Sequence, residues 1–145
     1  METVGSGNYL SNREWFRDAL RGQNVILCYT SALECHQLFL GYLNESQIDV
    51  YALDKGEYSN INYHVVESFE GIETVRFDDL VCTSVNQTVN DMLADFDNID
   101  EQSLIEALWY YYVTHNKSFD GLDISPQNMA RFGSIKDWAV GYKEE

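Results

Sequence analysis

Residues 80–96, LVCTSVNQTVNDMLADF, join two kinds of hydrophobic pattern. The first five residues, LVCTS, indicate a short strand. The rest indicates a helix, because its apolar residues recur at helical spacing and Thr83 or Ser84 can cap its first turn. The stretch therefore predicts a strand that leads directly into a helix. The apolar residues of the helix are Val85, Val89, Met92, Leu93 and Phe96.

Further strands are predicted on the N-terminal side of this stretch. In QIDVYA, Ile48, Val50 and Ala52 alternate onto one face, as in a half-buried strand. The turns GEYSN and EGIE separate the segments in the middle of the chain. Because these connections are tight, we expect antiparallel pairing rather than parallel crossovers. The predicted strands or extended segments are NVILCYT (24–30), QIDVYA (47–52), NINYHVV (60–66), ETVRF (73–77) and LVCTS (80–84).

Two helices are predicted in the first third of the chain. Ser11 and Glu14 have the spacing of a capping box, and Gly22 is a suitable stop for the helix that they begin. Ser31 and Glu34 repeat the capping-box spacing, and an apolar stripe follows them. Both helices flank the first predicted strand.

Two more helices follow the opening stretch. Asp100 can cap one of them, and Ser125 with Pro126 at the first helical position begins the other. We therefore predict a flexible lead-in over residues 1–10 and a single acidic α+β domain over residues 11–143. Its small, mainly antiparallel sheet is expected to have three to four strands and to pack with about five helices.

The chain of 145 residues carries 24 acidic and nine basic side chains, for a formal net charge of −15. A general DNA or RNA binder needs a cationic surface, so this balance disfavours direct contact with nucleic acid. The three cysteines lack the number and spacing of a disulfide framework. The sequence shows no signal peptide and no apolar run that could span a membrane, so we expect a cytoplasmic protein.

Negative charge is concentrated in residues 67–106, which carry eleven acids and one base, Arg76. Asp91 and Asp95 share one helical face, where like charges repel, and Asp97 also lies near the unfavourable C-terminal end of that helix. This uncompensated charge favours a surface for a cationic partner, with a solvated face and a metal site as alternatives. DFDNIDE lacks the residue order of a calcium loop, so we expect no metal and no cofactor.

The predicted partner-binding residues are seven acids and one tyrosine. Tyr110 points away from the apolar face of its helix, which makes it a candidate interface anchor. Asp100 and Glu101 differ from the other acids, because negative charge at a helix N-terminus is favourable without a partner. The full set is Asp78, Asp79, Asp91, Asp95, Asp97, Asp100, Glu101 and Tyr110.

Candidates for catalysis are few. Cys35 and His36 are adjacent, so on a helix they point about 100° apart, and no third orienting group is marked by the sequence. Asp91 and Asp95 offer a second candidate acid–base pair. No phosphate loop, metalloprotease motif or nucleophile elbow is present in the sequence. A small hydrolase therefore remains an alternative to a non-enzymatic protein.

One helical face near the N-terminus is basic, with Arg13, Arg17 and Arg21 spaced four residues apart. This stripe could contact phosphate. We expect it instead to pair with acids of the same chain or of a second copy, which leaves a homodimer open.

Three segments in order, YTSALECHQLF (29–39), IDVYA (48–52) and VCTSVNQTVNDML (81–93), match a known pattern. They resemble the "SAL…hGL" helix, the following strand and the later "vTs.erTlvDll" block of abortive-infection antitoxins of the AbiEi type. The resemblance covers roughly residues 27–115. The matching residues are Thr30, Ser31, Ala32, Leu33, Thr83, Ser84, Thr88, Asp91 and Leu93.

The resemblance implies an α/β unit that antagonises a nucleotidyltransferase-type toxin. In that family a winged helix precedes this unit and represses the operon, and here the winged helix is missing, so DNA-binding repression is not expected to carry over. The chain departs from the pattern at Asn86-Gln87-Thr88, which replaces "erT", and at Gln37, which replaces a glycine. The matching residues resemble fold determinants, since Thr88 can bond back within its helix.

The sequence thus predicts a non-enzymatic inhibitor that binds through its acidic region to a basic, nucleic-acid-handling protein. The antitoxin resemblance implies a cognate toxin as the target. The main alternative is a phage or mobile-element anti-CRISPR protein that imitates the phosphates of DNA and binds a CRISPR nuclease. The second alternative is the small hydrolase.

Overall fold

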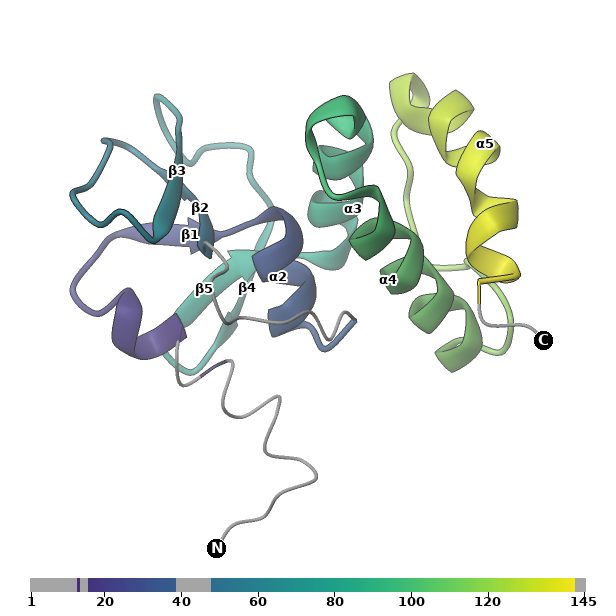
Figure 1. Cartoon of the computed structure of the whole chain (residues 1–145), viewed down its shortest axis with the longest axis horizontal. Coiled ribbons are helices and arrows are strands. Elements are labelled where there is room, and N and C mark those ends of the chain that lie inside the picture. Colours follow the sequence, from purple (N-terminus) through teal and green to yellow (C-terminus); the bar gives the residue numbers. More distant parts are fainter. Residues whose placement is uncertain (1–12, 14–15, 39–47, 143–145) are drawn as a thin grey trace, which may run out of the picture.

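A computed structural model describes residue 13 and residues 16–38 and 48–142 of the chain. The predicted lead-in and the capping residues Ser11 and Glu14 lie outside these residues. The described chain has one sheet and a group of helices beside it, with a short helix, α2 (Tyr29–Cys35), between the two (Figure 1). The predicted α+β class is confirmed.

The sheet has five strands in the order β3-β2-β1-β5-β4. The expected count of three to four strands is wrong. The segment that the sequence left open as a strand or an extended segment is a strand, and it lies at the centre of the sheet. The strands are β1 (Val25–Leu27), β2 (Ile48–Ala52), β3 (Ile61–Val65), β4 (Thr74–Phe77) and β5 (Leu80–Thr83).

The sheet is mixed, so the expectation of mainly antiparallel pairing is also wrong. β1 with β2 and β4 with β5 are antiparallel, whereas β1 with β5 and β2 with β3 are parallel. A five-residue strand spans about 17 Å, and residues 53–60 can extend over about 26 Å at ~3.3 Å per residue. The loop between β2 and β3 is therefore long enough to return along the strand without a helix.

Two of the three helices of the C-terminal half begin where the sequence predicts. At the third, Ser125 makes no side-chain cap bond, and Pro126 begins a short 3₁₀ turn rather than an α-helix. In α3 (Val85–Ala94), Ser84 Oγ accepts a hydrogen bond from the backbone N–H of Gln87 at 3.0 Å. In α4 (Glu101–Thr114), Asp100 Oδ1 accepts one from the backbone N–H of Gln102 at 3.2 Å. These bonds satisfy N–H groups that have no partner inside the helix. Two short 3₁₀ turns complete this half, η1 (Phe96–Asn98) and η2 (Pro126–Asn128), the second of which leads into α5 (Met129–Val140).

The predicted capping box at Ser31 and Glu34 is wrong. The N-cap of α2 is Cys28, three residues before Ser31, and it makes no side-chain cap bond. Ser31 Oγ instead accepts a hydrogen bond from the backbone N–H of Asp49 at 2.9 Å, which ties α2 to β2. Glu34 is buried, with 4% of its surface exposed.

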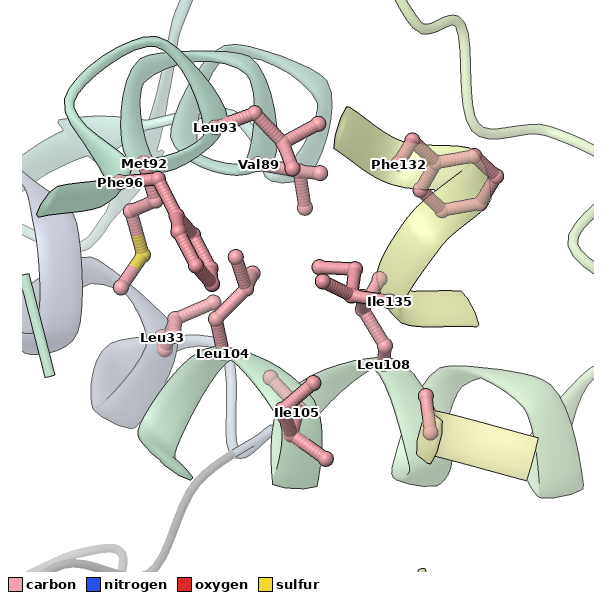
Figure 2. Packing of buried hydrophobic residues seen from close by; sticks show 12 residues of the cluster. Leu33, Val89, Met92, Leu93, Phe96, Leu104, Ile105, Leu108, Phe132 and Ile135 are labelled. Carbon is pink, nitrogen blue, oxygen red and sulfur yellow. The ribbon is translucent and has the colours of Figure 1, made fainter. Parts of the chain in front are cut away.

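Two hydrophobic clusters meet at α2. The sheet cluster includes Ile48 and Val50 together with Ala32 of α2. The helical cluster forms where α3, α4 and α5 face one another, and Leu33 of α2 reaches into it (Figure 2). One short helix thus contributes to both clusters, because its successive residues point in different directions. The helical cluster contains Leu33, Val89, Met92, Leu93, Phe96, Leu104, Ile105, Ala107, Leu108, Phe132, Ile135 and Ala139.

The three adjacent tyrosines of α4 differ in burial. Tyr111 is the buried one, and its hydroxyl donates a hydrogen bond to the carbonyl oxygen of Asp120 at 2.7 Å. Tyr112 and Trp109 are half-buried. Among the described helices, none has both the length and the apolar character needed to cross a membrane.

Candidate functional site

Four of the predicted partner-binding acids gather where α3 ends and α4 begins. Asp95 is the C-cap of α3, Asp97 lies in η1, and Asp100 and Glu101 begin α4. We call these four residues the acidic corner. Asp97, Asp100 and Glu101 are exposed, and Asp95 is half-buried. Within the described part of the chain, no lysine or arginine forms an ion pair with any of them.

A cation lies near the acidic corner without neutralising it. The guanidinium of Arg131, on α5, is placed over the ring of Phe96 at 4.7 Å from the ring centroid. This arrangement is a cation–π contact. It holds α5 against η1, and the corner keeps its negative charge.

Asp91 is half-buried and bonded within the chain, outside the acidic corner. Its Oδ2 accepts a hydrogen bond from the hydroxyl of Tyr51 at 2.8 Å, and its Oδ1 accepts one from Nε2 of Gln87 at 3.0 Å. Burial raises the pKa of the Asp91 carboxyl, and the two hydrogen bonds oppose that rise. Since both oxygens are used internally, Asp91 fastens α3 to β2.

Asp78 and Asp79 lie in a different place, in the two-residue turn between β4 and β5. Asp78 has a φ of 57°, a left-handed conformation that aspartate tolerates better than most residues. Its Oδ2 lies 3.4 Å from Nη2 of Arg17, and Asp79 Oδ1 lies 3.1 Å from Nε of the same arginine. The second contact is not aligned as a hydrogen bond, so it acts as an ion pair.

Arg17 belongs to the helical segment that includes Phe16–Ala19, which lies by the sheet and away from α4 in Figure 1. The arginine stripe therefore pairs, at Arg17, with acids of the same chain. Tyr110, the predicted anchor, is half-buried on α4 beside the ring of Trp109, with ring centroids 5.0 Å apart. The eight predicted residues are thus divided among several places, of which the acidic corner holds four.

A pocket of about 170 Å³ opens between the acidic corner and the sheet. Its helical wall comes from η1 and the start of α4, its opposite wall from β2 and β3, and the rest from the start of α2. Three carboxylates line it, and none of its lining residues is a lysine or arginine. The lining residues are Tyr29, Thr30, Asp49, Asn62, His64, Asp95, Asn98, Ile99 and Asp100.

The sheet wall of the pocket follows from the parallel pairing of β2 and β3. Asp49 is in register with Asn62, and Tyr51 is in register with His64. Alternation along a strand then places these polar side chains on one face, opposite the buried Ile48, Val50 and Ala52. Sequence reasoning missed Asp49, Asn62 and His64 because it assumed antiparallel pairing, although the alternating pattern that could have found them was present.

Hydrogen bonds and a ring contact hold several of the pocket side chains in place. Asp49 Oδ1 accepts a hydrogen bond from Nδ2 of Asn62 at 3.0 Å and lies 3.1 Å from Nε2 of His64. Asp95 Oδ1 accepts one from Nδ2 of Asn98 at 2.7 Å. The ring of Tyr29 meets that of His64 edge-on, with centroids 4.7 Å apart. The walls are therefore ordered by their own contacts.

No protein-family model matches this chain, and no curated protein matches it.

The cysteine and histidine candidates lie together in the interior. Cys35 and Cys82 are fully buried. Nε2 of His36 donates a hydrogen bond to the carbonyl oxygen of Thr83 at 2.8 Å and lies 3.7 Å from Cys82 Sγ. A hydrogen bond from the Cys82 thiol lowers the pKa of Cys35 against the opposing effect of burial, and the positive charge of Arg13 adds to this.

This arrangement offers little to a substrate. The His36 nitrogen that faces Cys82 carries its proton toward Thr83, so it has no lone pair with which to accept one. Burial also lowers the pKa of His36. Among the residues that the structure describes, no group of three or more histidine, cysteine, aspartate or glutamate side chains is placed to hold a metal ion.

Proposed function

We propose that this chain is a non-enzymatic binding protein whose acidic corner engages a basic, nucleic-acid-handling protein and blocks it. The supporting observation is the set of four carboxylates within seven residues, which no described lysine or arginine pairs. The N-terminus of α4 stabilises Asp100 and Glu101, whereas Asp95 and Asp97 lie at the C-terminal end of α3, where negative charge costs stability and a cationic partner would relieve that cost. Charge of this kind also accelerates encounter with a basic surface.

The resemblance to AbiEi-type antitoxins suggests a nucleotidyltransferase-type toxin as the target. The chain would then act as an antitoxin by occupying the toxin's basic surface. The same charge would also serve an anti-CRISPR protein that imitates DNA, and the identity of the captured partner distinguishes the two. In either case the inhibitor binds stoichiometrically and needs no cofactor.

Reversing charge in the acidic corner tests this proposal. Asp97→Lys with Glu101→Lys changes the net charge by +4 at two exposed positions. Glu57→Lys with Glu70→Lys makes the same change at exposed positions outside the corner and serves as the matched control. We expect affinity capture from host lysate to recover a basic nucleic-acid-binding protein with the wild type and the control, and to lose it with the corner variant.

Salt provides the second measurement. Binding that depends on exposed charge should weaken steeply as sodium chloride rises, because the Debye length falls from about 10 Å at 0.1 M to about 3 Å at 1 M. If the corner variant binds the captured protein as tightly as the control does, the carboxylates serve only solvation and the proposal fails.

A further inference from the structure

The pocket beside the acidic corner has the size of one side-chain head group. A cavity of about 150 Å³ is enough to hold a benzene molecule. The pocket, at about 170 Å³, therefore accommodates a planar group of that size. Its wall residues are fixed by hydrogen bonds to one another, so its shape exists before any ligand arrives.

Unused acceptors make the pocket selective for a cation with several donors. The hydrogen bonds to Asp49, Asp95 and Asp100 from described residues all end on Oδ1. Within the described part of the chain, the second oxygen, Oδ2, of each carboxylate accepts none. A guanidinium group presents five N–H donors in one plane, which suits several carboxylate oxygens around one hollow.

The remaining walls favour arginine over lysine. The ring of Tyr29 and the side chain of Ile99 line the pocket beside the carboxylates. A guanidinium stacks on aromatic faces and is less strongly hydrated than an ammonium group, so it loses less on entering a partly apolar hollow. A lysine would bring a compact, strongly hydrated charge that uses fewer of the acceptors.

We propose that this pocket receives one arginine side chain of the partner protein. The inference rests on the proposed function, since it supplies the anchor through which the acidic corner would grip a basic surface. The three carboxylates neutralise the guanidinium, and Tyr29 covers one of its faces. The exposed Asp97 and Glu101 lie outside the pocket lining and act through long-range attraction alone.

The test uses the whole chain and an isolated arginine. The probe, N-acetyl-arginine amide, is titrated into ¹⁵N-labelled protein and followed by NMR. We expect saturable shifts of the side-chain amides of Asn62 and Asn98, with a dissociation constant on the order of 1 mM for so small a ligand. The uncharged isostere N-acetyl-citrulline amide is expected to give no saturation, and N-acetyl-lysine amide is expected to bind more weakly.

Two conservative variants distinguish binding inside the pocket from long-range attraction by the negative charge around it. Asp100→Asn removes one pocket charge and keeps the α4 cap, since asparagine caps helices as well as aspartate does. We expect it to weaken arginine binding by about tenfold, as for loss of one charge-assisted hydrogen bond. Asp97→Asn removes the same charge from outside the pocket and should change binding by less than about twofold, because screening weakens exposed charges.

Three results would overturn the arginine pocket. They are the absence of saturable shifts at Asn62 and Asn98, equal binding of the citrulline or lysine probe, and equal losses from Asp100→Asn and Asp97→Asn. Failure of the proposed function has a different signature, because the arginine probe would still saturate the pocket while no charge-dependent partner is captured. Conversely, if a partner is captured through the acidic corner but the arginine probe does not saturate the pocket, the arginine pocket is wrong and the proposed function is supported.

Discussion

Glu34 shows how burial changes the chemistry of a single residue. It is on α2, is 4% exposed, and burial together with the nearby charge of Asp49 raises its pKa from 4.5 to about 8. The folded state therefore holds a proton on Glu34 at pH values where the unfolded chain has lost it. The contribution of Glu34 to stability is fully present below pH 4.5 and is lost as the pH rises toward 8, by about 1.4 kcal/mol for each unit of pKa shift.

Glu34→Gln should remove this pH dependence. We expect the free energy of unfolding of the variant, relative to that of the wild type, to rise by several kcal/mol between pH 4.5 and pH 8. The reason is that the glutamine side chain has no proton to lose. Urea denaturation at intervals of pH measures the difference. Glu57→Gln, at an exposed position, is the control and should leave the slope unchanged. Parallel curves for the wild type and Glu34→Gln would mean that Glu34 ionises normally in the folded protein.

At the scale of elements, the junction of β5 and α3 depends on Ser84. Its Oγ accepts the bond from Gln87 N–H and donates one to Oε1 of Glu73, next to the start of β4. Thr88, one turn on, donates to the carbonyl oxygen of Ser84 at 2.6 Å, as the sequence predicts. One serine thus holds the end of a strand, the start of a helix and a neighbouring segment.

Removing the Ser84 hydroxyl should destabilise the whole chain. We expect Ser84→Ala to lower the free energy of unfolding by ~1–2 kcal/mol, since it removes the cap and leaves Glu73 without a donor. Ser84→Thr keeps a capping hydroxyl and should lose less than half as much. Chemical denaturation monitored by circular dichroism measures both. An alanine variant as stable as the wild type would show that the cap contributes nothing here.

Elements were predicted well and their assembly was not. Periodicity and capping residues identified all five strand segments and the starts of α3 and α4, because those signals lie within a few residues of one another. One exception, α2, begins before its predicted cap, and Ser31 binds β2 instead. A capping serine is a local signal, and a tertiary hydrogen bond can redirect it.

For the whole molecule, the formal charge of −15 opposes folding. A compact chain brings like charges closer than an unfolded one does, so self-repulsion destabilises the native state. Sodium chloride screens that repulsion. We expect the melting temperature to rise by several degrees between about 20 mM and about 500 mM salt.

The acidic corner should contribute to this salt effect. Asp97→Asn removes one exposed negative charge there without touching the N-terminus of α4. The variant should melt higher than the wild type at low salt, and the gap should close as salt rises. Differential scanning calorimetry measures the melting temperatures of the variant and the wild type at each salt concentration. If salt lowers the melting temperature of the wild type, attractive ion pairs outweigh the repulsion.

The sequence by itself determined the class of fold, the position of most elements and the concentration of negative charge. Only the tertiary structure decided the strand order, the parallel pairing of β2 with β3, the burial of Glu34, the hydrogen bond between Tyr51 and Asp91, and the pocket. The physical reason is the range of the interactions. Periods and caps act over a few residues, whereas Asp49 and Asp100 line one pocket only because strand register and helix packing bring them together.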